Sequence, residues 1–321
     1  MFSQAAADRR RALLAALAVT VLWSSSWVII RVGLRDDRLP PLTFAGLRYV
    51  TAAVALWAAV ALNRTARGQL AGLTRRSVGH LAVLGLVFYA LTQGAQFVAI
   101  DSQPVATSSL FLTLTPLLVG LTSGRALRER PGRAQAAATV LVPAGTAAYF
   151  TGTLGATPAG LAACAVALAA NAGASLLGRG INRDATTAPL VTTAVSMTIG
   201  AVVLLAAGAG AEGWPALSGE AVAIIAWLAI INTAVAFTLW NFSLRHLTAG
   251  ESSVVNNAMM PQIGLLGWVF LGEAPGPWQW AGMLLVSAGV VIGQHRQRLS
   301  APAARDPRDI PRCPGPEMRG Q

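Results

Sequence analysis

The stretch IIRVGLRDDRLPPL (residues 29–42) occurs a second time, with substitutions, as LGRGINRDATTAPL (residues 177–190). The two stretches align without a gap, and identical residues fall at the positions of Arg31, Arg35, Asp36, Pro41 and Leu42. A longer match pairs SSLFLTLTPLLVGLTSGRALRERP (108–131) with SSVVNNAMMPQIGLLGWVFLGEAP (252–275) once one residue is dropped. The chain therefore contains one unit twice. Such an internal repeat constrains the fold more strongly than a single short motif does.

Composition indicates that this doubled unit lies in a membrane. Of the 321 residues, 54% are hydrophobic and only 12% are charged, whereas a soluble chain carries about 25% charged residues. The net charge of +11 comes from arginine alone, and the arginines lie between and after the apolar stretches. This distribution is typical of charge that sets membrane topology and argues against a nucleic-acid-binding face.

The chain offers ten apolar segments of the length that a bilayer requires, about 20 residues each. The first segment follows Arg9, Arg10 and Arg11 but is too long for a signal peptide, so we interpret it as a retained span. The tail is rich in proline and arginine and is predicted to be disordered. The expected spans are 12–33, 41–62, 79–100, 105–124, 134–150, 157–178, 188–208, 219–243, 249–271 and 277–295.

The arginines predict the orientation of these spans. Twenty of the 24 lie at the N-terminus, in every second connection or in the tail, and arginine favours cytoplasmic loops. Both termini are therefore expected in the cytoplasm, with the chain as a multi-pass protein of the cell membrane.

Because each unit holds an odd number of spans, the second copy must enter the bilayer from the opposite side. The predicted fold is all-α, with ten transmembrane helices in two inverted five-helix repeats, an arrangement found in secondary transporters. The expected parts are a cytoplasmic N-terminus (1–11), a first repeat (12–150), a second repeat (157–295) and a cytoplasmic tail (296–321).

Three stretches resemble the EamA domains of the drug/metabolite transporter superfamily. They are LWSSSWVIIRVGLRDDRLPPLTFAGLRYVTAA (22–53), TPLLVGLTSGRALRERP (115–131) and MMPQIGLLGWVFLGEAPGPWQWAGMLLVSAGVVIG (259–293). The resemblance implies an exporter or facilitator of amino acids, other metabolites or drugs. It also implies that the first four helices of each repeat surround a central cavity while the fifth and tenth serve as scaffold.

Polar side chains inside the first span are candidates for that cavity. The repeat alignment places Trp23 opposite Asn171, and Ser25 and Ser26 opposite small residues, all near midspan where transporter sites lie. Two interpretations of the serines remain open. They line a cavity, or they bond to the carbonyls of their own helix and serve only packing.

Amides and one tyrosine supply further candidates. Tyr89, Gln93 and Gln96 have the spacing of one α-helical stripe. Membrane amides often bond only to neighbouring helices, so each amide is either a solute contact or part of the packing. The further candidate amides in the second repeat are Asn232, Asn241, Asn256, Asn257 and Gln262.

Arg48 lies within the second span, and a charge inside the membrane is a functional candidate by default. Three interpretations of Arg48 remain open: its side chain contacts a carboxylate of the solute, it extends to the membrane surface, or it serves as a structural clamp inside the protein.

Pro116 and Pro261 fall at matching positions of the two repeats. A proline inside a helix bends the helix, so we predict two gates at opposite depths.

Other functions fit the residues less well. The three histidines lie at span ends without carboxylates at ligand spacing, so neither a metal site nor an enzyme is expected, and no cofactor is implied. Charge rings and filter loops of a channel are not visible. The favoured solutes are amino acids or related amphipathic metabolites. The alternatives are a cationic-drug exporter of the same family or a membrane sensor that transports nothing.

Overall fold

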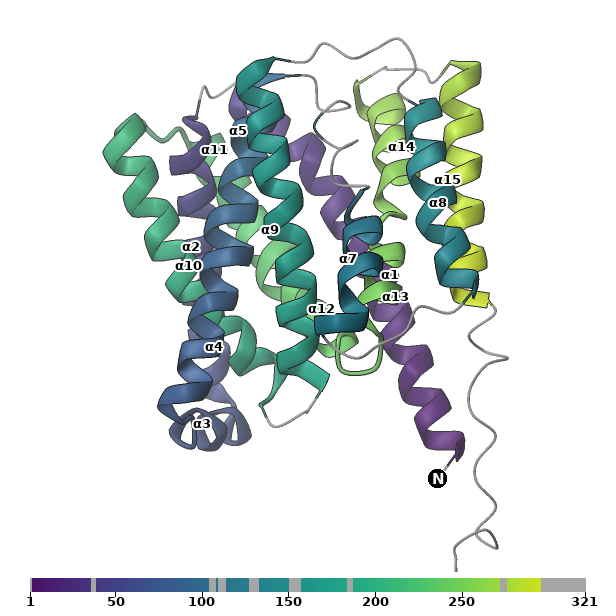
Figure 1. The fold of residues 1–321 in the computed structure, drawn as a ribbon. Helices are drawn as coiled ribbons and strands as arrows, with labels where there is room; N and C mark the ends of the chain where they lie inside the picture. The colour runs from purple at the N-terminus through teal and green to yellow at the C-terminus, as the bar shows by residue number, and fades with distance from the viewer. Residues whose placement is uncertain are drawn as a thin grey trace, which may run out of the picture.

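The computed structural model describes residues 2–35, 39–103, 108, 114–126, 133–149, 157–183, 187–271 and 276–295. Every regular element in these ranges is helical (Figure 1). Six of the described helical segments are long and apolar enough to cross a membrane. They are Ala7–Leu34, Pro41–Leu62, Arg75–Ser102, Pro158–Arg183, Pro189–Glu212 and Gly219–Ser243.

The described helices overlap the expected spans. The first repeat contains α1 (Phe2–Arg35), α2 (Pro41–Leu62), α3 (Arg64–Ala71), α4 (Arg75–Gly85), η1 (Leu86–Thr92), α5 (Gln93–Ser102), α7 (Thr115–Ala126) and α8 (Arg133–Tyr149). The second contains α9 (Pro158–Arg183), α10 (Pro189–Glu212), α11 (Gly219–Ala229), η2 (Ile230–Val235), α12 (Ala236–Ser243), α13 (Ala249–Asn256), α14 (Met259–Leu271) and α15 (Pro277–His295). Most of the expected span 105–124 and the whole tail 296–321 lie outside the described residues.

One short helix was not expected. The connection after α2 forms α3, and its first turn is capped by the Asn63 side chain, which accepts a hydrogen bond from the Ala66 backbone N–H. Asparagine is a preferred N-cap because its oxygen satisfies an N–H that has no partner within the helix. These residues lie in a connection between two expected spans, and the structure shows them as a capped helix.

Two π-helical segments interrupt the third span of each repeat at the same position. These segments are η1 and η2, and the alignment that pairs Ser108 with Ser252 also pairs Leu86 with Ile230. In both, a threonine hydroxyl donates to the carbonyl five residues earlier, Thr92 to Val87 at 2.8 Å and Thr233 to Leu228 at 2.7 Å. Such bulges widen the helical turn and are frequent at functional sites.

The expected span 249–271 is a broken helix. α13 ends at Asn256 and α14 begins at Met259. Pro261 is the third residue of α14, and Pro116 is the second residue of α7. In a first turn the missing N–H of proline costs no hydrogen bond, so both prolines begin helices rather than bend them at midspan. Each proline thus stands in the first turn of a described helix, and its role as a gate stays a prediction.

Close backbone contacts hold the helices together. α2 packs on α10, where a Cβ on Gly46 would lie 2.5 Å from Leu205 Cα. α8 and α15 lie side by side at one edge of the bundle (Figure 1), where a Cβ on Gly145 would lie 2.7 Å from Leu285 Cβ. Small residues at these sites let membrane helices approach closely without a hydrophobic driving force.

The start of α1 and the whole of α3 lie at the same end of the bundle (Figure 1). At this end Arg9 forms an ion pair with Glu251 at 2.5 Å, which joins α1 of the first repeat to α13 of the second. At the other end the Glu212 carboxylate accepts hydrogen bonds from the backbone N–H groups of Leu42 and Thr43 at the start of α2. The arginine-rich N-terminus and the arginine-rich α3 therefore share one side.

Candidate functional site

A cavity lies between the two repeats. Its volume is about 80 Å³, below the about 300–1,000 Å³ of typical small-molecule sites, so its side chains must move apart to admit a solute of amino-acid size. On α1 it begins at Trp23 and ends at Ile30, which is the half of the helix farther from the N-terminus. Its lining comprises Trp23, Ser26, Trp27, Ile30, Arg48, Tyr49, Phe88, Thr92, Gln93, Gln96, Thr115, Asn171, Ser175, Phe237, Trp240, Ser253, Asn256, Asn257, Met259, Met260 and Ile263.

One wall of the cavity is aromatic. The centroid of the Trp23 ring lies 4.9 Å from that of Phe237 and 5.1 Å from that of Trp240, and the ring planes meet at 52° and 50°. Phe88 packs edge-on against Phe237 at 5.2 Å. Tilted and edge-on contacts of this kind hold aromatic rings in fixed orientations. The wall therefore offers a rigid apolar surface to a solute.

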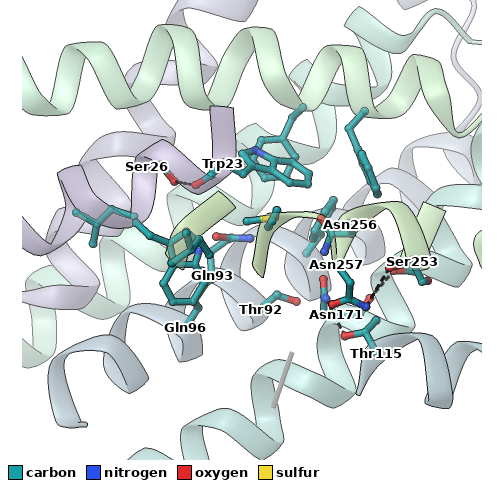
Figure 2. A pocket seen from close by; sticks show the side chains of 18 of the residues that line it. Trp23, Ser26, Thr92, Gln93, Gln96, Thr115, Asn171, Ser253, Asn256 and Asn257 are labelled. Atoms are coloured by element: carbon teal, nitrogen blue, oxygen red, sulfur yellow. Dashed lines mark hydrogen bonds between the residues drawn. The ribbon is translucent and has the colours of Figure 1, made fainter. Parts of the chain in front are cut away.

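The facing wall carries amides and hydroxyls. Asn171 on α9 donates to the Thr115 hydroxyl at 3.1 Å, and Asn257 donates to the Ser253 carbonyl at 3.3 Å (Figure 2). Gln93 and Gln96 line the cavity from α5, the segment that directly follows η1. Trp23 and Asn171, paired by the repeat alignment, thus lie in one cavity.

Two polar atoms at the cavity are buried without a hydrogen-bond partner among the described residues. They are Trp23 Nε1, a donor, and Asn256 Oδ1, an acceptor. Burying an unpaired polar atom costs free energy, so a solute that offers one acceptor and one donor would recover it. Asn256 is the last residue of α13 and lies at the break before α14.

The serines of the first span bond mainly to their own helix. Ser25 donates to the Leu22 carbonyl at 2.8 Å and Ser26 to the Trp23 carbonyl at 2.7 Å. Ser24 donates to the Thr20 carbonyl at 2.6 Å and contacts Gln262 on α14 at 2.9 Å. This pattern matches the packing interpretation for Ser25, whereas Ser26 both bonds to its helix and lines the cavity.

Arg48 is 2% exposed and lines the cavity from α2. Its Nε donates to the Thr233 hydroxyl at 2.7 Å and its Nη2 to the Asn232 carbonyl at 3.3 Å, both on η2. No Asp or Glu is among the described residues that line the cavity. Arg48 therefore supplies positive charge that no carboxylate of the described lining neutralises.

Several of the candidate residues lie beside the cavity rather than in its lining. Ser25 accepts a hydrogen bond from the Asn232 amide at 3.0 Å, which joins α1 to η2. Asn241 is bonded to Asn182 at 2.8 Å and to Thr193 at 2.9 Å. Tyr89 is fully buried against other aromatic rings. The π-helical turn explains the position of Tyr89, because the stripe with Gln93 and Gln96 assumes a regular α-helix.

Several lining residues were not predicted. The repeat alignment itself could have found two of them, since it pairs Gln93 with Phe237 and Gln96 with Trp240. The others carried no signal beyond an apolar or small polar side chain in a span. They are Trp27, Ile30, Tyr49, Phe88, Thr92, Thr115, Ser175, Ser253, Met259, Met260 and Ile263.

The described residues contain no group of three metal-ligating side chains. Cys164 is buried and unpaired, with its thiol within 3.2 Å of the Gln103 amide. Cys164 is not among the residues that line the cavity.

The sequence model of the EamA-like transporter family matches residues 10–151 and again residues 159–292. Among curated proteins, the chain is 24% identical over 280 residues to the uncharacterized transporter YwfM of Bacillus subtilis, covering 86% of this chain and 91% of YwfM. It is 32% identical over 121 residues to the uncharacterized transporter YoaV of the same organism, covering 37% and 39%. A protein of known crystal structure, 21% identical, superposes with a TM-score of 0.73 over 89% of this chain and 98% of its own.

Proposed function

Because the chain belongs to the EamA-like transporter family, we propose that it is a secondary transporter of small amphipathic metabolites such as amino acids. The solute occupies the cavity between the repeats, and the two repeats rock about it so that the cavity opens to each side in turn. In this proposal ten helices cross the cell membrane, and both termini lie in the cytoplasm. The observation that carries the solute class is Arg48, the one cation among the described lining residues, which include no carboxylate.

The cavity supports a solute with three features. The ring wall of Trp23, Phe237 and Trp240 favours an apolar side group. Arg48 favours a carboxylate, because a guanidinium binds carboxylates with charge-assisted hydrogen bonds. The unpaired Asn256 oxygen favours a donor such as an ammonium group. A zwitterion with an apolar side chain has all three.

The closed end of the bundle supports alternating access. Ala12 and Ala16 on α1 are fully buried, as are Leu247 and Ala249 of the second repeat. The Arg9–Glu251 ion pair joins the two repeats at this same end. A solute in the cavity is therefore separated from the N-terminal end by packed side chains, which must part for passage in that direction.

The aromatic wall also favours a second class, the lipophilic cations, because cations bind to the faces of tryptophan rings. Arg48 opposes this class. Two like charges about 7 Å apart repel by about 2 kcal/mol at an effective dielectric constant of about 20, which is roughly 30-fold in affinity. We therefore propose amino acids ahead of cationic drugs.

A counterflow experiment tests the proposal. Purified protein in liposomes preloaded with one solute is offered radiolabelled amino acids and, separately, labelled cationic drugs. Accumulation of zwitterionic amino acids that is lost in Arg48→Gln supports the proposed class. Accumulation of cations that increases in Arg48→Gln would replace it with the drug class. A protein that binds solutes but accumulates none under any gradient would be a sensor.

A further inference from the structure

Arg48 is held by the opposite repeat. The guanidinium belongs to α2 of the first repeat, whereas both of its hydrogen-bond acceptors belong to η2 of the second. The Thr233 hydroxyl accepts from Nε at 2.7 Å, and the Asn232 carbonyl accepts from Nη2 at 3.3 Å. The described residues provide no hydrogen-bond acceptor for Nη1. One edge of the guanidinium is thus fixed, and Nη1 keeps its two donors for another acceptor.

The π-helical form of η2 makes this arrangement possible. The Thr233 hydroxyl donates its single hydrogen to the Leu228 carbonyl at 2.7 Å, so its lone pairs remain free to accept from Arg48. The widened turn also leaves the Asn232 carbonyl within reach of Nη2. A regular α-helix would rotate one of these two acceptors away, because each residue added or removed turns the helix by about 100°.

The first repeat has the same bulge without the same partner. α10 packs against η1 as α2 packs against η2. The gapless alignment of the repeats pairs Arg48 with Ser196, whose hydroxyl donates to the Thr192 carbonyl of its own helix at 2.6 Å. The cation is therefore a feature of only one of the two equivalent contacts. Packing alone needs no guanidinium at this position, since the α10–η1 contact forms with a serine.

We infer that Thr233 is a positioning residue for the recognition of a solute carboxylate: η2 fixes the Arg48 guanidinium so that its free edge serves the cavity. The inference rests on the proposed function, in which Arg48 binds the carboxylate. The anion site is then built from both repeats, and its affinity depends on the π-helical form of η2. A movement that rewinds η2 withdraws the support from Arg48 and lowers the affinity for the carboxylate.

Thr233→Val tests the inference, because valine keeps the shape of threonine but can neither accept from Arg48 nor donate to Leu228. Counterflow is measured with L-leucine and with L-leucinamide, which lacks the carboxylate. The expected result is a half-saturation concentration for leucine raised by about 10-fold at an unchanged maximal rate, the value for one charge-assisted hydrogen bond. The value for leucinamide stays unchanged.

Two further variants complete the design. Thr233→Ser restores the hydroxyl and should restore the parent value for leucine. Thr238→Val removes a hydroxyl that donates only to the Ala234 carbonyl, on the same span and outside the cavity lining, and should behave as the parent. Where Thr233→Val elutes as an aggregate in detergent size-exclusion chromatography, Thr233→Cys, which keeps the volume with a weak hydrogen-bonding thiol, takes its place.

The outcomes separate the inference from the proposed function. Parent-like leucine affinity in Thr233→Val, together with loss in Arg48→Gln, overturns the inference alone. Equal losses for leucine and leucinamide, or losses that serine does not restore, assign Thr233 to packing and also overturn it. Unchanged leucine counterflow in Arg48→Gln, or the absence of counterflow for any carboxylate-bearing amino acid in the parent, overturns the proposed function and the inference together.

Discussion

Gly85 and Gly200 face each other so closely that a Cβ built on Gly200 would overlap the carbonyl oxygen of Gly85. The same Cβ would lie 2.7 Å from Tyr89 Cβ, within η1. Gly85 ends α4 directly before the π-helix, so this contact fixes the span that carries Phe88, Thr92 and Gln93 to the cavity. Helix packing and the shape of the site therefore depend on the same pair of residues.

Gly200→Ala should destabilise the protein. The added methyl group has backbone on one side and Tyr89 on the other, and overpacking of this kind costs about 1–3 kcal/mol. Thermal unfolding in detergent measures the effect. Gly210→Ala is the matched control on the same helix, because nothing lies within 4 Å of its Cβ position and alanine favours the helix. A melting temperature for Gly200→Ala equal to that of the control would contradict the close packing.

Cysteine labelling in intact cells tests the predicted orientation. In a Cys313→Ser background the remaining Cys164 is buried, and Ala71→Cys and Ala216→Cys introduce exposed thiols at opposite ends of the bundle. A membrane-impermeant maleimide should label position 216 and leave position 71 unlabelled until the cells are permeabilised. The reverse pattern would invert the orientation, since α3 and the N-terminus lie on the same side.

Trp23→Ala and Asn171→Ala should each slow counterflow by about 10-fold or more, since they remove one ring of the aromatic wall and one amide of the facing wall. Ser24→Ala should matter less, because its hydroxyl already bonds to the Thr20 carbonyl. Ser287→Ala on α15, whose hydroxyl bonds only within its own helix, is the control for purification and folding. Parent-like rates in both Trp23→Ala and Asn171→Ala would move the solute to another site.

Pro116 and Pro261 remain the predicted gates. The expected mechanism is now a break between two helices rather than a bend inside one helix. Pro261 lies in the first turn of α14, just after the break at which Asn256 and Asn257 line the cavity. Alanine there restores an N–H that favours a continuous helix across the break. Pro261→Ala should therefore lower the maximal rate several-fold at an unchanged melting temperature. Pre-steady-state solute release, measured beside Pro116→Ala, checks this expectation, and unchanged kinetics in both variants would remove the gate role.

Hydropathy predicts the positions of most of the described helices, because it acts over a whole span. The ranges 41–62, 219–243 and 277–295 agree with the helix bounds of the structure. Local irregularities were missed. LVFYALT and IINTAV form π-helices, yet no side chain in either segment distinguishes them from ordinary helical sequence. The widened turns lie where the spans pack against α10 and α2, and hydropathy does not encode such contacts.

For the candidate cavity, the sequence identifies lining residues that have a conspicuous polar or aromatic side chain at midspan. It does not identify those that line the cavity only because of how the helices pack. Trp23, Ser26, Arg48, Gln93, Gln96, Asn171 and Asn257 are polar or aromatic residues at midspan, and all line the cavity. Asn232 and Asn241 have the same chemistry but bond to neighbouring helices instead. In the sequence, Phe237 and Trp240 look like ordinary core residues. Only the folded structure shows that they line the aromatic wall of the cavity.

The unequal walls of the cavity have a kinetic consequence. Inverted repeats with identical side chains would present the same surface to both sides of the membrane, whereas here Gln93 and Gln96 on one repeat correspond to Phe237 and Trp240 on the other. Half-saturation for entry and for exit should therefore differ. In a passive carrier any such difference is balanced by the maximal rates, because the ratio of maximal rate to half-saturation must be equal in both directions at equilibrium. A ratio that differs between entry and exit would require a second, energetically coupled ion.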